Sequence, residues 1–171
     1  MRISIIGFSG SGKSTLAKNL SVKLNIPVLY LDKVLYLKNW EKRELNLCKE
    51  IVYNFIQKNK YWVIDGNYFK FHLEERMKIS DKIIFLNFNR IICLIQAFNR
   101  YNEYKGKTRE SISDGCEEKF DFEFIKWIVY DSRKESRINI LNDIIEKYRD
   151  KVIICETHDD INKVYNSINI D

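Results

Sequence analysis

The sequence predicts an α/β fold in which a five-stranded parallel sheet lies between two layers of helices. Short apolar runs alternate along the chain with longer segments in which apolar residues recur at helical spacing. A glycine-rich loop stands between the first apolar run and the first helical segment. Strands that alternate with helices build parallel sheets covered on both faces. The 171 residues have the length of one ordinary domain, so we expect a single domain over residues 1–171.

The apolar pattern places these elements in order. The first strand is an apolar run at residues 3–6, and the first helix follows at residues 13–24, with Leu16, Leu20 and Leu24 on one face. The other strands are predicted at residues 28–31, 61–64, 82–88 and 152–155. The other helices are predicted at residues 40–58, 90–104 and 123–148, the last of these bent or interrupted, with a terminal helix from about Asp159.

Composition and charge exclude several classes of protein. With 45% hydrophobic and 31% charged residues, the chain is typical of a globular protein rather than a disordered one. Its net charge of +5 suits anionic ligands such as phosphates but is too small to indicate nucleic-acid binding by itself. The longest apolar stretch, residues 83–95, is interrupted by Asn87, Asn89 and Arg90, so we expect no membrane-spanning helix.

The cysteines and the first residues bear on the cellular compartment. Cys48, Cys93, Cys116 and Cys155 are far apart and show neither metal-ligand spacing nor a disulfide framework. Residues 1–7 are too short an apolar segment, and too soon ended by glycine, for a signal peptide. We therefore expect reduced thiols in a cytoplasmic protein.

Residues 7–14 match the phosphate-binding pattern GxxxxGK[ST] over its full length. The glycines of this pattern let successive backbone N–H groups surround a phosphate, and the helix that follows directs its positive end at the same anion. Lys13 is expected to reach the β- and γ-phosphates, and the Ser14 hydroxyl is expected to bind Mg²⁺. The alternative is a glycine-rich turn without a ligand, which the position between a strand and a helix disfavours.

The pattern therefore predicts a three-layer P-loop NTPase that binds ATP or GTP, and we take ATP and Mg²⁺ as the expected cofactors. The predicted nucleotide-binding residues are Gly7, Ser9, Gly10, Ser11, Gly12, Lys13, Ser14 and Thr15.

Two acidic residues stand at the ends of predicted strands. Asp65 would hold Mg²⁺ through water, with a simple strand-end cap as the alternative. Asp32 would contact an acceptor hydroxyl as a general base, or would cap the helix that follows it. Because ligands bind outside the carboxyl ends of parallel strands, we expect Gly7, Asp32 and Asp65 to converge on one site.

Aromatic and polar residues follow both acids. Tyr36 and Trp40 come after Asp32 and are candidates to stack on an acceptor ring, with a core position as the alternative for Trp40. The loop after Asp65 turns away over the site. The predicted substrate-binding residues are Asp32, Tyr36, Gly66, Asn67 and Tyr68.

Residues 100–109 form a basic and aromatic segment, with glycine hinges at Gly106 and Gly115. Phosphoryl transfer spreads negative charge over phosphate oxygens, so a kinase needs arginines that close over them and exclude water. We interpret the segment as a mobile lid, with a solvated surface loop as the alternative. Four arginines are candidates to neutralise transition-state charge: Arg100, Arg109, Arg133 and Arg137.

Taken together, several motifs resemble the adenylate-kinase-related family called DNA topology modulation proteins. The resemblance covers about residues 1–145 and is carried by residues 7–14, 26–32, 62–68, 104–109, 114–121 and 124–127. It implies a nucleoside-monophosphate-kinase-like fold with an acceptor-binding region at about residues 32–72 and a lid at about residues 100–122. It also implies that Arg100 matches the arginine ending the helix before the lid, and that Asp65 and Gly66 match the Asp-Gly pair after the third strand.

The sequence departs from adenylate kinases at the acceptor site. Residues 67–70 are Asn-Tyr-Phe-Lys, where those enzymes carry an arginine that grips the acceptor phosphate, and Gln96 stands where a second such arginine is expected. Asp32 would repel an acceptor that already carries a phosphate. These departures weigh against AMP as the acceptor.

Three functions follow as hypotheses. The first is an ATP-dependent phosphotransferase acting on a nucleoside, nucleotide or other small hydroxyl compound. The second is a nucleotide-dependent regulatory protein acting on DNA topology, for which the modest charge gives little support. The third is a bare ATPase without an acceptor.

Overall fold

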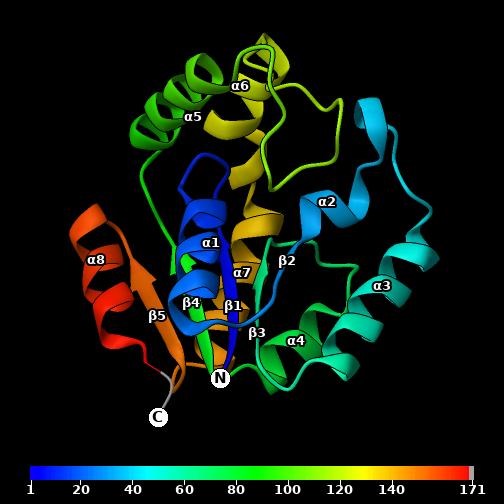
Figure 1. The fold of residues 1–171 in the computed structure, drawn as a ribbon. Coiled ribbons are helices and arrows are strands. Elements are labelled where there is room, and N and C mark those ends of the chain that lie inside the picture. The colour runs from blue at the N-terminus through cyan, green and yellow to red at the C-terminus, as the bar shows by residue number, and fades with distance from the viewer. Residues whose placement is uncertain (170–171) are drawn as a thin grey trace.

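The computed structural model describes residues 1–169, and a five-stranded sheet forms its centre. All its neighbouring strands are parallel, in the order β2-β3-β1-β4-β5 (Figure 1). The predicted α/β fold with a five-stranded parallel sheet is therefore confirmed. The strands are β1 (Arg2–Gly7), β2 (Val28–Tyr30), β3 (Trp62–Asp65), β4 (Lys82–Leu86) and β5 (Val152–Cys155).

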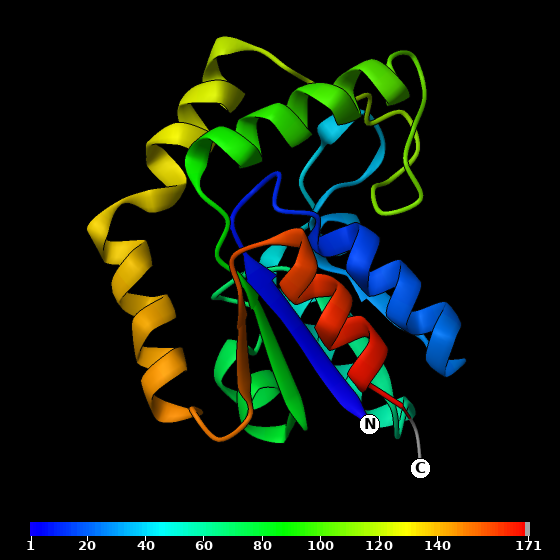
Figure 2. The same cartoon turned by 90° about the vertical axis from the view of Figure 1, so that its left-hand side faces the viewer.

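Helices cover both faces of the sheet. Figure 2 shows α1 and α8 together on one face and α7 on the opposite face, where the Tyr148 hydroxyl at the end of α7 donates to Glu74 of α4 at 2.9 Å. The helices are α1 (Lys13–Leu24), α2 (Leu31–Leu35), α3 (Leu45–Lys58), α4 (Leu73–Ile79), α5 (Arg90–Tyr104), α6 (Phe122–Val129), α7 (Glu135–Lys147) and α8 (His158–Ser167), with short 3-10 turns η1 (Lys38–Trp40) and η2 (Asp131–Arg133).

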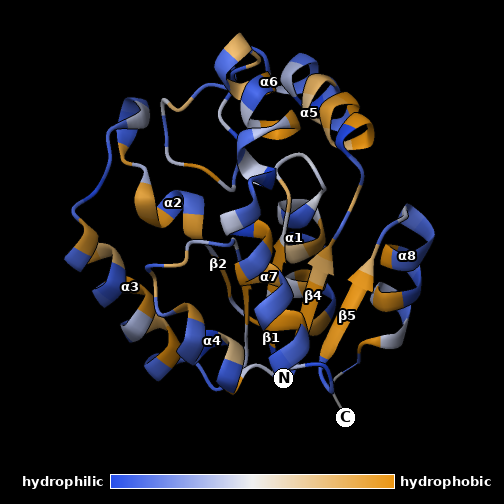
Figure 3. Ribbon diagram, turned by 180° about the vertical axis from the view of Figure 1, so that it is seen from behind, coloured by the Kyte–Doolittle hydropathy of each residue, from blue (hydrophilic) through white to orange (hydrophobic). Residues whose placement is uncertain are grey.

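Apolar side chains on the strands and on the inner helix faces form the core, as the hydropathy colouring in Figure 3 shows. In α1 the buried residues include Leu16, Leu20 and Leu24, the face expected from the sequence. A second apolar cluster packs α2 and α3 against β3. Its fully buried members include Leu31 and Trp62. Burial of this cluster anchors α2, and with it Asp32, beside the end of β3.

Two elements begin or end elsewhere than expected. The second strand ends at Tyr30 and Leu31 begins α2, so Asp32 lies in the first turn of a helix rather than after a strand. The third helix begins at Leu45 instead of residue 40, because Asn39 and Trp40 have φ values of +59° and +66°, which an α-helix does not accept.

The sequence missed the helices α2 and α4 and overestimated one strand. The seven-residue α4 carries too short an apolar pattern to be distinguished from a loop. The fourth strand ends at Leu86, two residues before the expected end, and a backbone amide at Asn87 pairs with Cys155. The interruption predicted in the helix at residues 123–148 is confirmed, because η2 separates α6 from α7.

The segment between α5 and α6, residues 105–121, contains no helix or strand. Figure 1 shows it extending from the top of the molecule toward α2 and η1. Within residues 1–169, none of the helices combines the length and apolar character that a bilayer crossing needs.

Candidate active site

The glycine-rich loop begins where β1 ends and leads directly into α1. The loop is pressed against α5, since a Cβ on Gly10 would lie 2.3 Å from the Cys93 carbonyl oxygen. Gly10 also has a φ of +80°, so only glycine fits this position. Gly12 is the N-cap of α1, and Thr15 is exposed in the first turn of that helix. This strand–loop–helix geometry is the one that the phosphate-binding pattern predicts.

Lys13 spans the loop, and its Nζ donates to the Phe8 carbonyl oxygen at 2.8 Å. Burial lowers the pKa of Lys13, while the charges of Asp65 and Asp32 oppose that shift. The parallel register pairs Tyr30 of β2 with Asp65 of β3, so Asp32, two residues after Tyr30, lies at the same edge of the sheet. The Lys13 ammonium is the cation that the phosphate-binding pattern predicts beside the phosphates of a nucleotide.

Asp65 and Ser14 meet beside Lys13. The parallel register pairs Ile5 of β1 with Asp65 of β3, and the Ser14 hydroxyl donates to Asp65 Oδ2 at 2.6 Å. The other carboxylate oxygen, Oδ1, is buried and has no hydrogen-bond partner within residues 1–169. Burial raises the pKa of Asp65 to about 6, against the opposing effects of Lys13 and Ser14. A hydroxyl beside a carboxylate with an unused oxygen fits Mg²⁺, which prefers hard oxygen ligands and retains several waters.

Helix α6 and the turn η2 brace the loop from its other side. The Trp127 indole nitrogen donates to Ser9 Oγ at 2.9 Å, and the Arg133 guanidinium lies 3.6 Å from the centroid of the Phe8 ring. Arg137 in turn lies 4.7 Å from the Trp127 ring centroid. Both arginines therefore contact aromatic rings at the outside of the loop, and their role in charge neutralisation stays a prediction.

Asp32 forms its main contact with the loop that follows β3. The Tyr68 hydroxyl donates to Asp32 Oδ1 at 2.5 Å. Burial and the Asp32 charge raise the pKa of Tyr68, so its proton remains on the phenol. The N-cap of α2 is Tyr30, so Asp32 does not cap this helix, and its contact with an acceptor hydroxyl stays a prediction. Burial and the same carboxylate raise the pKa of Tyr36, whose backbone nitrogen donates to the Asp32 carbonyl oxygen at 2.9 Å.

The other residues of that loop serve to hold it in place. The Asn67 amide accepts from the backbone nitrogen of Gly7 and donates to its carbonyl oxygen, each at 2.9 Å. Gly66 donates through its backbone nitrogen to the Ile5 carbonyl oxygen at 3.0 Å. These bonds tie the predicted substrate-binding loop directly to the start of the phosphate-binding loop. In the phosphate-binding loop itself, the Ser11 hydroxyl is buried and has no hydrogen-bond partner within residues 1–169.

Two of the predicted arginines meet in the segment between α5 and α6. Arg100 Nε donates to Glu118 Oε2 at 2.9 Å, and Arg109 Nε donates to the other oxygen of the same carboxylate. Arg109 also donates to Ser111 Oγ at 2.9 Å. The Glu118 side chain is only 4% exposed, so this arrangement is a nearly buried cluster of two cations and one anion.

The same segment contacts the acceptor region. Cys116 Sγ accepts from the Trp40 backbone nitrogen at 3.2 Å and donates to the Leu37 carbonyl oxygen at 3.1 Å. The Ser113 hydroxyl bonds to the Tyr36 carbonyl oxygen. Trp40 therefore belongs to an interface between the two regions. These contacts are those expected of a lid in a closed position, and its movement stays a prediction.

Two residues in this site carried no recognisable sequence signal. Glu118 lies in a run of charged residues that reads as solvated surface. Arg76 lies in α4 among acidic neighbours, yet its side chain is fully buried beneath the loop after β3. Their positions depend on contacts far apart in sequence, so only the folded chain shows them.

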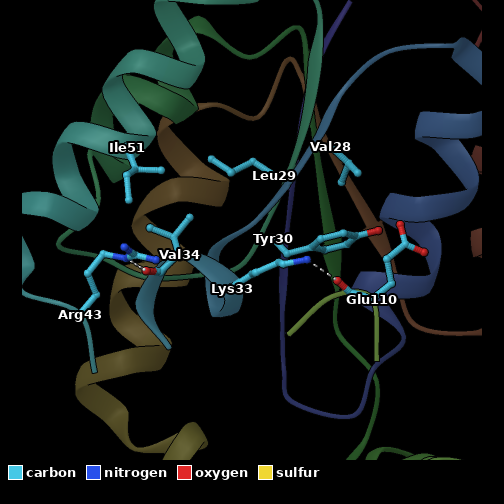
Figure 4. A pocket seen from close by; sticks show the side chains of 8 residues that line it. All are labelled: Val28, Leu29, Tyr30, Lys33, Val34, Arg43, Ile51 and Glu110. Carbon is cyan, nitrogen blue, oxygen red and sulfur yellow. Dashed lines mark hydrogen bonds between the residues drawn. The ribbon is translucent and has the colours of Figure 1, made fainter. Parts of the chain in front are cut away.

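Figure 4 shows a cavity of about 370 Å³ at the outer edge of β2. In it, Arg43 Nε donates to the Val34 carbonyl oxygen at 2.8 Å, and Lys33 Nζ lies 3.4 Å from the Glu110 carbonyl oxygen. The lining residues are Val28, Leu29, Tyr30, Lys33, Val34, Arg43, Ile51 and Glu110, so the cavity lies beside the phosphate-binding loop rather than at it.

Comparison with known proteins establishes the fold. Neither a protein-family model nor a curated protein sequence matches the chain. Similar solved structures include a shikimate kinase from Acinetobacter baumannii in complex with shikimate, with a TM-score of 0.53 and 13% identity over 96% of this chain and 88% of that one. A shikimate kinase from Bacteroides thetaiotaomicron has a TM-score of 0.49 and 18% identity over 97% of this chain and 94% of that one. The likeness to the Acinetobacter baumannii structure, together with the glycine-rich loop between β1 and α1, shows the P-loop, nucleoside-monophosphate-kinase-like fold. Its resemblance to the DNA topology modulation proteins stays a prediction.

Proposed function

We propose that this protein is an ATP-dependent phosphotransferase that acts on a small hydroxyl compound. One observation carries the proposal: Ser14 bonds to Asp65 at the end of β3, and the loop after that strand carries Tyr68, which bonds to Asp32. A nucleotide site alone would suit any NTPase. A carboxylate beside that site, linked to a phenol and covered by the segment between α5 and α6, is what a second substrate with a hydroxyl group requires.

The cofactors fit the residues present. The backbone N–H groups of the loop and Lys13 would hold the phosphates of ATP, while Ser14 directly and Asp65 through water would hold Mg²⁺. Bound Mg²⁺ neutralises charge on the phosphate oxygens. The unused Oδ1 of Asp65 supports this assignment.

In the proposed reaction the acceptor oxygen attacks the γ-phosphorus of ATP. A new P–O bond forms, the bond between the γ-phosphorus and the bridging oxygen breaks, and ADP leaves with that electron pair. The acceptor proton passes to Asp32, which serves as the general base. Tyr68 stays protonated and holds the carboxylate in place through its 2.5 Å hydrogen bond.

The lid arginines would stabilise the charge that develops during transfer. Arg100 and Arg109 lie in the lid, and their charges act on Lys13 and Asp65 respectively. Closure of the lid over the acceptor region would exclude water and favour transfer to the acceptor over hydrolysis.

The test is ADP formation with MgATP across a panel of nucleosides, nucleoside monophosphates and small alcohols. Removing the Lys13 ammonium should lower acceptor-dependent turnover by roughly 100-fold, because it removes stabilisation of the transferring phosphoryl group. The variants are Lys13→Ala and, as matched control, Lys163→Ala on the exposed face of α8. Equal turnover in the two variants would contradict the proposal. Turnover that no acceptor raises above the rate in water alone would instead favour a bare ATPase.

A further inference from the structure

The groups around Asp32 offer hydrogen-bond acceptors. Asp32 Oδ1 receives the Tyr68 hydroxyl, and the carboxylate takes no other hydrogen bond from residues 1–169. Because the Tyr68 proton is committed to Asp32, its phenol oxygen offers only lone pairs to a ligand. A compound with O–H donors matches this pair. A phosphate dianion does not, because it brings only acceptors and a charge of the same sign.

The first arginine after Asp65 in the chain is unavailable to such a ligand. Arg76 is fully buried, and its three donor groups bond to carbonyl oxygens of Phe71 at 2.9 Å and of Gly66 and Tyr68 at 3.3 Å. Burial lowers the pKa of Arg76 to about 9. This guanidinium therefore supports the loop from beneath and cannot grip an acceptor phosphate without unfolding the loop.

The lid cations are partly neutralised. Arg100 and Arg109 share the Glu118 carboxylate, so the cluster carries a net charge of +1 instead of +2. The remaining charge of Arg100 acts on Lys13 and on Asp32, and that of Arg109 acts on Asp65.

The two tyrosines that bond to Asp32, Tyr68 and Tyr36, each belong to an aromatic pair. The Tyr68 ring stacks on Phe71 with centroids 4.9 Å apart and an angle of 7° between the rings. Tyr36 meets Trp40 edge to face, with centroids 5.1 Å apart. Such surfaces favour the faces of rings and sugar carbons over an ionised group.

Resting on the function proposed above, we infer that the acceptor is an uncharged hydroxyl compound, either a nucleoside or a polyol, and that the site rejects phosphorylated analogues. The pair of hydrogen-bond acceptors at Asp32 and Tyr68 selects the hydroxyl donors. The buried position of Arg76 withholds one counter-ion from a second phosphate, and Glu118 offsets half of the charge that the two lid arginines carry.

The experiment compares matched pairs on the wild-type protein with MgATP. The pairs are adenosine with AMP, cytidine with CMP, ribose with ribose 5-phosphate, and glycerol with glycerol 3-phosphate. We expect kcat/KM for at least one uncharged member to exceed that of its phosphorylated partner by about tenfold or more. The nucleoside and polyol pairs identify which source of hydroxyl groups is used. A preference for the phosphorylated member overturns the inference.

A binding measurement separates this inference from the proposed reaction. Each compound is added to the wild-type protein with Mg²⁺ and a non-hydrolysable ATP analogue, and the rise in Tm is recorded. If uncharged compounds raise the Tm but receive no phosphate, the acceptor class holds and the phosphotransferase proposal fails. If only phosphorylated compounds raise the Tm, or no uncharged compound does, the inference about acceptor class fails.

The Asp32→Asn variant tests the cause of the selectivity. It keeps the shape of the side chain and removes its charge. Turnover with the uncharged acceptor should therefore fall by about 100-fold, and the ratio of kcat/KM between the uncharged compound and its phosphorylated partner should decrease. Unchanged discrimination in a folded variant would show that Asp32 does not determine the acceptor class.

Discussion

Glu118 positions both lid arginines through a single carboxylate. It bonds to the Nε atom of each, so the Nη groups of Arg100 make no hydrogen bond within residues 1–169 and stay free for phosphate oxygens. A guanidinium held at its Nε edge loses little further side-chain entropy when its other edge binds a phosphate. This makes Glu118 a positioning residue in the proposed reaction.

Glu118→Gln should lower kcat roughly tenfold and change the KM for the acceptor little, because the variant loses the carboxylate charge that orients the lid arginines. Steady-state kinetics would measure both parameters. Glu117→Gln is the matched control, since its side chain is exposed next to the same site. If both variants reduce kcat alike, or neither does, Glu118 has no such role.

At the scale of elements, the lid docks on η1 through a close approach of Gly115 to the Asn39 side chain. A Cβ on Gly115 would lie 2.5 Å from Asn39 Oδ1, and Gly115 has a φ of +73°. Gly106 has a similar φ of +70°, but an added Cβ there would meet nothing within 4 Å. The two glycines share the same backbone strain on substitution, and only Gly115 adds a clash with the acceptor region.

Gly115→Ala should therefore weaken lid docking, raise the KM for the acceptor severalfold and speed amide hydrogen exchange at residues 110–118. Gly106→Ala should lower stability by about 1 kcal/mol through strain alone and leave acceptor binding close to normal. Hydrogen exchange monitored by mass spectrometry compares the two variants. Identical exchange in the lid of both would contradict a docking role for Gly115.

At the scale of the whole molecule, Asp65 opposes folding at neutral pH. Burial raises its pKa from 3.8 to about 6, so the folded state holds this proton more tightly than the unfolded chain. The favourable contribution of Asp65 to the free energy of unfolding is present below about pH 4 and is lost as the pH rises through about 6. The loss corresponds to about 3 kcal/mol at neutral pH.

Asp65→Asn should consequently be more stable than the wild type at pH 7 by up to about 3 kcal/mol and nearly equal to it at pH 4. The same variant should lose Mg²⁺-dependent ATP turnover. A gain in stability with a loss of activity is typical of substitutions at functional sites. Urea unfolding between pH 4 and pH 7 measures the difference in free energy of unfolding. Asp143→Asn, exposed on α7, is the control and should show no such pH dependence. A difference between Asp65→Asn and wild type that stays constant with pH would contradict the burial argument.

Local pattern was sufficient for the fold class and for the nucleotide site. The strand–loop–helix signal at residues 3–24 depends on residues adjacent in sequence, and β1 and α1 occur where it predicts them. The acidic end of β3 follows from the same reasoning, because parallel strands bring their carboxyl ends to one edge. Contacts between neighbours in the chain need no knowledge of distant packing.

The tertiary structure decided the acceptor side of the site. Whether Asp32 caps α2 or faces a ligand depends on Tyr68, 36 residues away, and the positions of Arg76 and Glu118 depend on which loop or arginine each one meets. A charged residue in a sequence is equally compatible with solvent and with a buried pair, since both satisfy its charge. Only the packing of the lid, and the packing of α4 against the sheet, decides whether Glu118 and Arg76 are exposed to solvent or buried with a partner. For that reason the sequence alone predicted a nucleotide site in a P-loop fold, whereas the chemical class of the proposed acceptor is argued from long-range contacts.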